Sequence, residues 1–225
     1  MTELPENQGI GVSGDQGSGI TDEVGFDEII VRGNRRMTIH DLNLLDSSSR
    51  QIEAKTIVEI GSMDGCSSMV LGRVARDNGG RLYCVEPHPR GRWIQNILEL
   101  GLKPHVTLIQ AESPWIDPAL LPAGPIDFLL IDGDHRCSRA IADYVFWARF
   151  VRAGGRIAFH DIDGGKGVAV WIRQAVEIAE RDDNLANEQG LDYKIRQIAR
   201  TPEARDRGTI VFEKLAEARP LLKED

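Results

Sequence analysis

The sequence predicts an α/β fold built on a doubly wound, mostly parallel sheet with helices on both faces. Predicted strands alternate with predicted helices from residue 56 onward, and such alternation implies right-handed crossovers between parallel strands. Ile126–Ile131 is almost wholly apolar, which is typical of a central parallel strand covered on both faces. The last two predicted strands have only a short polar link between them, so we expect them to pair antiparallel at one edge.

The individual elements follow from local patterns along the chain. Before the alternation starts, we expect a short strand at Ile29–Arg32 and a helix near His40–Gln51. Short β-branched or apolar runs then predict strands at Thr56–Ile60, Arg81–Val85, Val106–Gln110, Ile126–Ile131, Gly155–Phe159, Tyr193–Ile198 and Thr209–Phe212. Helical spacing of apolar residues predicts helices at Ser67–Arg76, Arg90–Leu100, Ser138–Phe150 and Val168–Glu180.

Composition and charge exclude several classes of protein. The 225 residues are 41% hydrophobic and 28% charged, which is ordinary for a globular protein. The net charge of −8 argues against a general nucleic-acid binder, whose affinity comes mostly from phosphate neutralisation. No apolar stretch approaches the roughly 20 residues that cross a bilayer, and no secretory signal opens the chain. Cys66, Cys84 and Cys137 lack CxxC spacing, so we expect reduced thiols in a cytoplasmic protein.

The chain divides by composition into a leader and one domain. Residues 1–25 are rich in glycine and poor in large apolar groups, so we expect a flexible leader, serving either as a tail without a role or as a lid. Residues 26–225 are predicted to form a single domain, with 26–55 as an N-terminal cap region and 56–215 as a ligand-binding core. The sequence leaves the oligomeric state open, a homo-oligomer included.

In a doubly wound sheet, ligands bind beyond the carboxyl ends of the strands, so the residues that follow each strand are the candidates for a site. The first strand is followed by a turn with Gly61 and Gly65 in GxxxG spacing, and Ser67 is placed to cap the next helix. This spacing differs from the GxGxxG of dinucleotide enzymes, and a simple tight turn explains it equally well. Glu86 ends the second strand 21 residues after Gly65, the separation expected for a carboxylate that binds a ribose. Ala111 to Ser113 follow the third strand and offer an edge for a heterocycle.

Acidic residues and histidines follow the fourth and fifth strands. Asp132-Gly133-Asp134-His135 comes after one strand and His160-Asp161-Ile162-Asp163 after the next. Carboxylates that share a cleft repel one another unless a cation or a proton intervenes, and oxygen-rich groups suit Mg²⁺ or Ca²⁺. The alternative is a set of solvated loop acids and helix caps.

Four motifs in this order, VEIGSMDGCSS, the strand ending in Glu86, FLLIDGDH and GGRIAFHDI, resemble class I S-adenosylmethionine-dependent methyltransferases. More narrowly, they resemble small-molecule O-methyltransferases with IDGDH and HD strand ends, which act on sugars and other natural products. The resemblance covers residues 56 to 212. It implies a Rossmann-like, seven-stranded sheet whose last strand inserts antiparallel, and a small-molecule hydroxyl as the methyl acceptor.

The same resemblance assigns roles to individual residues. It implies that the turn with Glu59, Gly61, Ser62 and Gly65, followed by Ser67, surrounds the methionine part of S-adenosylmethionine, with Asp132 nearby. It places Glu86 on the ribose and Ala111 and Ser113 beside the adenine. Asp132 and Asp161 occupy the positions of Mg²⁺ ligands in metal-dependent relatives. Those relatives often carry a further acid or an Asn after the second ligand, where this chain has Ile162, so Asp134, His160 or Asp163 remains to complete the metal shell.

Chemistry then suggests a mechanism in which His135 is the general base. A histidine with an ordinary pKa near ~6.5 is substantially neutral at cytosolic pH and accepts the proton of an attacking hydroxyl. Two other functions stay open on the sequence. One is an NAD(P)-dependent oxidoreductase, against which the GxxxG spacing counts; the other is a non-catalytic S-adenosylmethionine-binding protein, against which the intact Asp132, His135 and Asp161 count.

Overall fold

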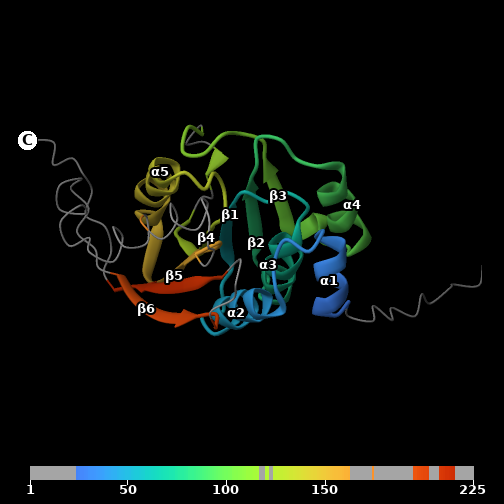
Figure 1. Ribbon diagram of the computed structural model, residues 1–225, viewed down its shortest axis with the longest axis horizontal. Helices are drawn as coiled ribbons and strands as arrows, with labels where there is room; N and C mark the ends of the chain where they lie inside the picture. The colour runs from blue at the N-terminus through green and yellow to red at the C-terminus, as the bar shows by residue number, and fades with distance from the viewer. Residues whose placement is uncertain are drawn as a thin grey trace, which may run out of the picture.

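A computed structural model describes residues 24–116, 120–121, 124–162, 174, 195–202 and 208–215. Within these residues the chain begins with two helices and continues with alternating strands and helices (Figure 1). The helices are α1 (Phe26–Arg32), α2 (Ile39–Arg50), α3 (Cys66–Asp77), α4 (Gly91–Glu99), the short 3₁₀ helix η1 (Lys103–His105) and α5 (Cys137–Ala148). The strands are β1 (Thr56–Ile60), β2 (Arg81–Val85), β3 (Val106–Ile109), β4 (Ile126–Ile131), β5 (Val151–Phe159), β6 (Ile195–Arg200) and β7 (Ile210–Lys214).

The strands form one seven-stranded sheet in the order β3-β2-β1-β4-β5-β7-β6. Strands β1 to β5 pair in parallel, whereas β7 inserts antiparallel between β5 and β6. This order confirms the predicted, mostly parallel sheet and the antiparallel pairing of its last two strands. The order reverses between β1 and β4, and the ligand site of such a sheet is expected above their carboxyl ends.

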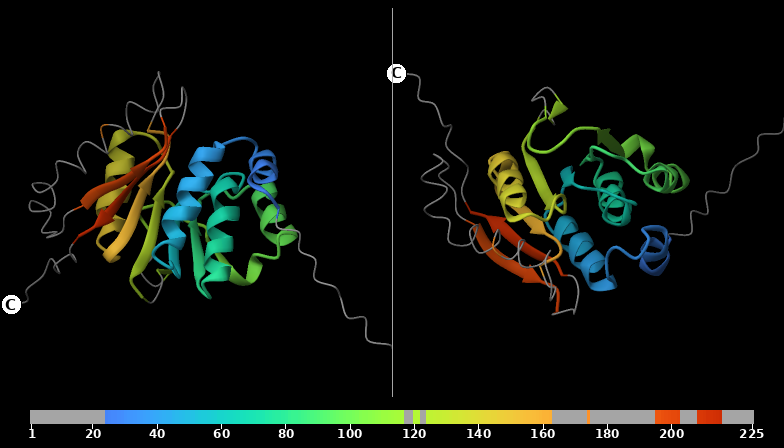
Figure 2. Two further views of the ribbon diagram at one scale, coloured as in Figure 1. Left: turned by 90° about the horizontal axis from the view of Figure 1, so that it is seen from below. Right: turned by 45° about the horizontal axis from the view of Figure 1, so that its top comes forward.

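Two hydrophobic cores cover the two faces of the sheet, as expected from side chains that alternate along each strand. Val58 and Ile60 of β1 belong to the core under α5, and Ile57 of the same strand belongs to the core under α2 and α3. Figure 2 shows α5 on one side of the sheet, with α2, α3 and α4 side by side on the other. Each strand is therefore fixed from both sides, which fixes the positions of the loops that follow.

The predicted strand at Ile29–Arg32 is wrong, because these residues lie in helix α1. The β-branched run suggested a strand, but Asp27 and Glu28 favour the start of a helix and Arg32 pairs with Glu28 one turn earlier. The helix buries Ile29 and contacts α3, so tertiary packing overrides the local preference for a strand.

Helix α2 matches its prediction and begins with a capping box. The Thr38 hydroxyl accepts a hydrogen bond from the Asp41 backbone N–H, and the Asp41 carboxylate accepts one from the Thr38 N–H. Asp41 is fully buried, where it also accepts a hydrogen bond from the Thr209 hydroxyl near β7 at 2.8 Å. The start of α2 is therefore tied to the residue that precedes β7.

Some predictions lie outside the described residues: nearly all of the leader and, apart from Gln174, the helix at Val168–Glu180. The division at residues 25, 55 and 215 stays a prediction. Within the described part of the chain, no helix has the length and apolar character needed to span a lipid bilayer.

Candidate active site

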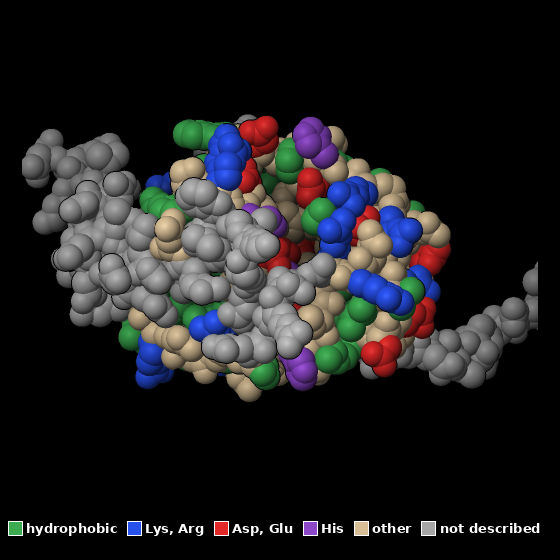
Figure 3. All heavy atoms as spheres, in the orientation of Figure 1, with side chains coloured by type: hydrophobic (Ala, Val, Ile, Leu, Met, Phe, Trp, Pro, Cys, Tyr) green, Lys and Arg blue, Asp and Glu red, His purple; other side chains and the backbone are tan. Residues whose placement is uncertain are grey.

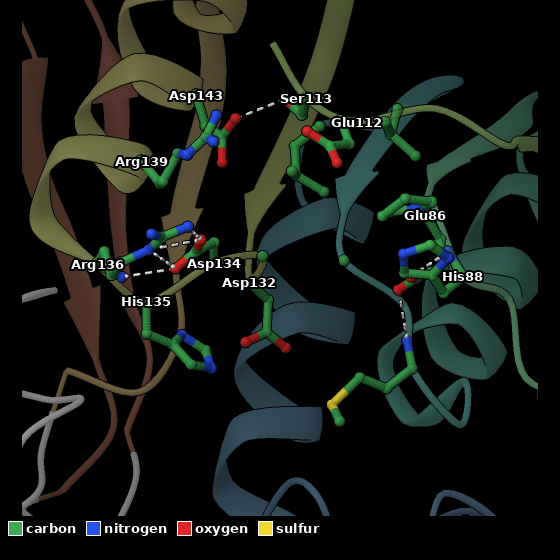
Figure 4. A pocket seen from close by; sticks show the side chains of 16 residues that line it. Glu86, His88, Glu112, Ser113, Asp132, Asp134, His135, Arg136, Arg139 and Asp143 are labelled. Atoms are coloured by element: carbon green, nitrogen blue, oxygen red, sulfur yellow. Dashed lines mark hydrogen bonds and ion pairs between the residues drawn. The ribbon is translucent and has the colours of Figure 1, made fainter. Parts of the chain in front are cut away.

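A pocket of about 480 Å³ opens above the carboxyl ends of β1, β2 and β4. In the space-filling view, acidic and histidine side chains gather around a hollow near the middle of the molecule (Figure 3). The close-up shows Glu86 and His88 on one wall and Arg136, Arg139 and His135 on the opposite wall, with Asp132 between them (Figure 4). This is the place at which a doubly wound sheet binds its ligand.

The turn between β1 and α3 forms part of the pocket wall, and its glycines are structurally required. Gly61 has a φ of +82°, and a Cβ there would lie 2.4 Å from the Asp132 carbonyl oxygen. Gly65 has a φ of +88° and lies at the N-cap of α3, where a Cβ would come within 3.0 Å of Trp93. Both glycines therefore allow a close approach that no other residue permits without strain.

Ser67 does not cap α3, contrary to the expectation from the sequence. The helix begins at Cys66, and the Ser67 hydroxyl within its first turn donates a hydrogen bond to Glu59. Ser68 donates to the other oxygen of the same carboxylate, and the Cys84 thiol lies 3.1 Å from it. Burial raises the pKa of Glu59 to about 7, although these hydrogen bonds act in the opposite direction.

Glu86 joins the two turns that follow β1 and β2. Its Oε2 accepts hydrogen bonds from the backbone N–H groups of Ser62 at 3.1 Å and Met63 at 3.2 Å. Its Oε1 accepts one from the His88 N–H at 2.9 Å. A carboxylate oxygen offers about two acceptor directions, so Oε1 keeps one for a ligand in the pocket.

A buried polar cluster closes the end of the pocket beside α5. The Ser113 hydroxyl donates to Asp143 Oδ1 at 2.5 Å and accepts a hydrogen bond from the Trp147 indole N–H at 2.8 Å. Burial raises the pKa of Asp143 to about 6, and the hydrogen bond from Ser113 only partly opposes this rise. Ala111 packs against the core and does not line the pocket.

Three potential metal ligands lie close together, two of them, Asp132 and His135, in the lining of the pocket. Among the described residues, Asp132, His135 and Asp161 place one ligand atom each within 4.8 Å of one another. His135 Nε2 lies 3.4 Å from Asp161 Oδ2, and His135 Nδ1 is buried without a hydrogen-bond partner in the described structure. Asp161 has a φ of +58°, an uncommon conformation for a non-glycine residue that is often retained at functional sites.

His160 lies behind this group, 2% exposed, and contacts three carboxylates. Its Nδ1 lies 3.1 Å from Asp132 and 3.5 Å from Asp161, and its Nε2 lies 3.7 Å from Asp41 of α2. Burial by itself lowers the pKa of His160, but the charge of Asp132 and the other carboxylates outweigh it and raise that pKa well above its usual value. A protonated His160 therefore offsets the negative charge behind the site.

The site brings together most of the residues predicted from the sequence. The pocket is lined by Gly61, Glu86, Ser113, Asp132 and His135. Ser62 and Ser67 line a smaller hollow of about 20 Å³, which shares Met63 and Asp132 with the main pocket. Glu59 lies fully buried beneath the turn, and Gly65 shapes that turn. Asp134 pairs with Arg136 and lies outside the group of three potential metal ligands.

Sequence reasoning missed Asp143 and the link from His160 to Asp41. Asp143 has a detectable signal, because it shares a helix face with Ala140, Tyr144 and Trp147, where an acid is unexpected. His160 and Asp41 are separated by most of the chain, and their contact has no local signal in the sequence.

Comparisons with known proteins find similarity to methyltransferases. Residues 58–162 match a family model described as a methyltransferase domain. The chain is 29% identical over 151 residues to a catechol O-methyltransferase of Mycobacterium tuberculosis, a match to 63% of this chain and 64% of that protein. It is 31% identical over 115 residues to a catechol O-methyltransferase of Niastella koreensis, covering 49% and 50% of the two chains. The matched region thus spans 64% and 50% of the lengths of these curated relatives.

A solved structure shows the same fold. The O-methyltransferase from Streptomyces achromogenes, solved in complex with S-adenosylmethionine, superposes with a TM-score of 0.62 at 18% identity, over 85% of this chain and 89% of that one. Residues 58–162 thus match a methyltransferase domain, and the sheet has the fold of a solved O-methyltransferase. The relatives from Mycobacterium tuberculosis and Niastella koreensis are both catechol O-methyltransferases.

Proposed function

We propose that this protein transfers the methyl group of S-adenosylmethionine to a hydroxyl of a small molecule, with the assistance of Mg²⁺. The observation that carries the proposal is the meeting of Glu86, Asp132 and His135 in one pocket at the switch point of a methyltransferase fold. The catechol O-methyltransferases among the relatives favour oxygen as the methyl acceptor.

The cofactor is assigned to the space between the turn after β1 and the turn after β2. Glu86 has an acceptor direction available for the ribose hydroxyls, and Gly61 allows a ligand to approach the backbone. Ser62, Gly65, Ser67 and the buried Glu59 shape the wall for the methionine part, because Glu59 holds Ser67 and Ser68 at the start of α3. The adenine then points toward Ser113 and α5.

The donor set at the pocket floor fits a divalent cation. Asp132 and Asp161 would hold Mg²⁺ through carboxylate oxygens, which this ion prefers, and water would complete its shell. Two carboxylates that converge without a cation repel one another, and His160 offsets this charge from one side only. When bound, the ion lowers the pKa of a coordinated hydroxyl group.

His135 is the group that accepts the hydroxyl proton. Its Nδ1 is buried, so we assign the proton transfer to Nε2, on the side of Asp161. The sulfonium of S-adenosylmethionine supplies the leaving group, so the protein has to hold the acceptor oxygen in line and remove its proton. Positioning and proton removal are thus the two tasks of the pocket residues.

Two measurements test the proposal. Calorimetric titration should show binding of S-adenosylhomocysteine and no binding of NADH, which separates a methyltransferase from an oxidoreductase with a similar sheet. Transfer of a labelled methyl group from S-adenosylmethionine to catechol, followed with and without Mg²⁺, then tests the reaction. Binding of NADH in place of S-adenosylhomocysteine would overturn the proposal, and binding without transfer to catechol or related hydroxyl compounds would indicate a non-catalytic binding protein.

A further inference from the structure

A buried carboxylate lies at the end of the pocket where the adenine is placed. Asp143, in the middle of α5, is 3% exposed and yet lines the pocket. Figure 4 shows its side chain beside Ser113, on the opposite side of the pocket from Glu86. An acid in such a position needs a hydrogen-bond donor, since an unpaired buried carboxylate is unfavourable.

Ser113 meets that need for one oxygen only. The Ser113 hydroxyl donates its single hydrogen to Asp143 Oδ1, and the Trp147 indole N–H at 2.8 Å fixes the hydroxyl in this orientation. A serine hydroxyl has one hydrogen to donate. Ser113 therefore has no donor left for a ligand, and it acts on the pocket by holding Asp143.

The second oxygen of Asp143 is available. Within the described residues, no protein donor forms a hydrogen bond with Oδ2. Gly133 lies next to this oxygen, and a Cβ on Gly133 would come within 3.5 Å of it and 3.2 Å of Ile60. The absence of a side chain at Gly133 keeps the space beside Oδ2 open.

The charges around Asp143 leave it an acceptor near neutral pH. Arg139, one turn earlier on α5, favours the ionised carboxylate, and Asp134 disfavours it. Burial raises the pKa to about 6, so the group is mainly ionised at pH 7.5. An ionised carboxylate accepts hydrogen bonds and cannot donate them.

Building on the proposed function, we propose that Asp143 determines the specificity for adenine by accepting a hydrogen bond from its exocyclic amino group at Oδ2. With the ribose on Glu86, the base extends toward Ser113 and Gly133, where Asp143 is the buried acceptor. The exocyclic amino group of adenine supplies the hydrogen-bond donor that Asp143 Oδ2 lacks. A base with a carbonyl oxygen at that position would face the carboxylate with a second acceptor, and binding would weaken.

The experiment compares two ligands that differ at this position. S-adenosylhomocysteine carries the amino group, and S-inosylhomocysteine carries a carbonyl oxygen in its place. Calorimetry at pH 7.5 should give wild-type protein a preference for the adenosyl compound of roughly 10–100-fold, the range of a hydrogen bond to a charged group. In Asp143→Asn, whose amide both donates and accepts, that preference should fall below about 3-fold.

Asp46→Asn is the matched control. Asp46 lies on α2, pairs with Arg50 and is not among the residues that line the pocket, so the same replacement there should leave the ligand preference unchanged. Asparagine has nearly the shape of aspartate, and circular dichroism verifies that the variant folds. An unchanged preference in Asp143→Asn, or its loss in Asp46→Asn, would overturn the assignment to Asp143 while leaving the proposed function intact. Failure of the wild-type protein to bind S-adenosylhomocysteine would overturn the proposed function and this inference with it.

Discussion

At the scale of single residues, His135 has two possible roles, and its position is compatible with both. It lies among the potential metal ligands, and it is also the residue that we propose as the general base. One nitrogen cannot do both, because a nitrogen bound to a metal ion has no lone pair for a proton. Asp132 and Asp161 already supply two oxygen ligands, which favours His135 as the base.

Replacing His135 by alanine should therefore lower the turnover number by roughly 10²–10⁴-fold, the usual contribution of a general base. The dissociation constant of S-adenosylhomocysteine and that of Mg²⁺, both measured by calorimetry, should change little. Loss of Mg²⁺ binding in His135→Ala would instead identify the residue as a ligand, and an unchanged turnover would exclude both roles.

The burial of Asp143 leads to a prediction about how the stability of the ligand-free protein depends on pH. Its pKa is about 6 in the folded protein, whereas an ordinary aspartate has a pKa of 3.8. The folded protein therefore holds this proton more tightly than the unfolded chain. Its contribution to stability is complete below pH 4 and is lost as the pH rises through 6. At about 1.4 kcal/mol per pKa unit, the loss is at most about 3 kcal/mol.

Asp143→Asn should remove this dependence. In urea unfolding, the free energy of the variant relative to wild type should rise by about 2 kcal/mol between pH 4.5 and 7.5, because about 1 kcal/mol of the contribution is already lost at pH 4.5. Taking the difference between the proteins cancels other groups that titrate in this range, such as Glu59 with a pKa of about 7. A difference that stays constant with pH would contradict the burial of an ionised Asp143.

At the scale of elements, α2 is fastened to the sheet by charge as well as by apolar packing. Asp41, near its first turn, reaches His160 after β5 and Thr209 before β7. Burial raises the pKa of Asp41, but the hydrogen bond and the charge of His160, together with the bonds from Thr38, outweigh it and lower the pKa to about 2. The helix thus supports the residues that carry the site.

Asp41→Asn should destabilise the protein at pH 7 by about 2 kcal/mol, because the ionised form is favoured in the folded state. This contribution is present above the unfolded pKa of 3.8 and is lost as the pH falls through about 2. Urea unfolding at pH 7 and pH 2.5 should thus show a smaller difference from wild type at the lower pH. Asp46→Asn on the same helix removes a more exposed pair with Arg50 and should cost less than about 1 kcal/mol at either pH.

The whole molecule is needed to assemble the site. Asp132 follows β4 and Asp161 follows β5, and they come within reach of one cation only because these strands are neighbours in parallel. An unfolded chain keeps no such arrangement, so a cation that binds here stabilises the folded state by mass action.

Added Mg²⁺ should accordingly raise the melting temperature in a concentration-dependent way, and EDTA should reverse the rise. At 100 times the dissociation constant, the expected stabilisation is about 2.7 kcal/mol. Asp132→Asn and Asp161→Asn should each abolish it, whereas Asp134→Asn, outside the group of three, should keep it. Full methyl-transfer activity after exhaustive EDTA treatment would show that the reaction does not use a metal ion.

The sequence by itself determined the sheet and the loops that carry the site. Strand-helix alternation and the apolar run at Ile126–Ile131 are local patterns, and parallel strands necessarily bring their carboxyl ends to one edge. Glu86, Asp132 and Asp161 follow three different strands, so their nearness was predictable from the order of elements. A local pattern failed where packing decided, as in the β-branched residues of α1.

Only the tertiary structure decided which side chains support the site from behind. Asp143 with Ser113, and His160 with Asp41, are pairs that meet across elements distant in the chain. Likewise, the Ser67 hydroxyl binds Glu59 in place of capping its helix. Such choices depend on side-chain directions and on competition for buried hydrogen bonds, which exist only once the layers have packed together.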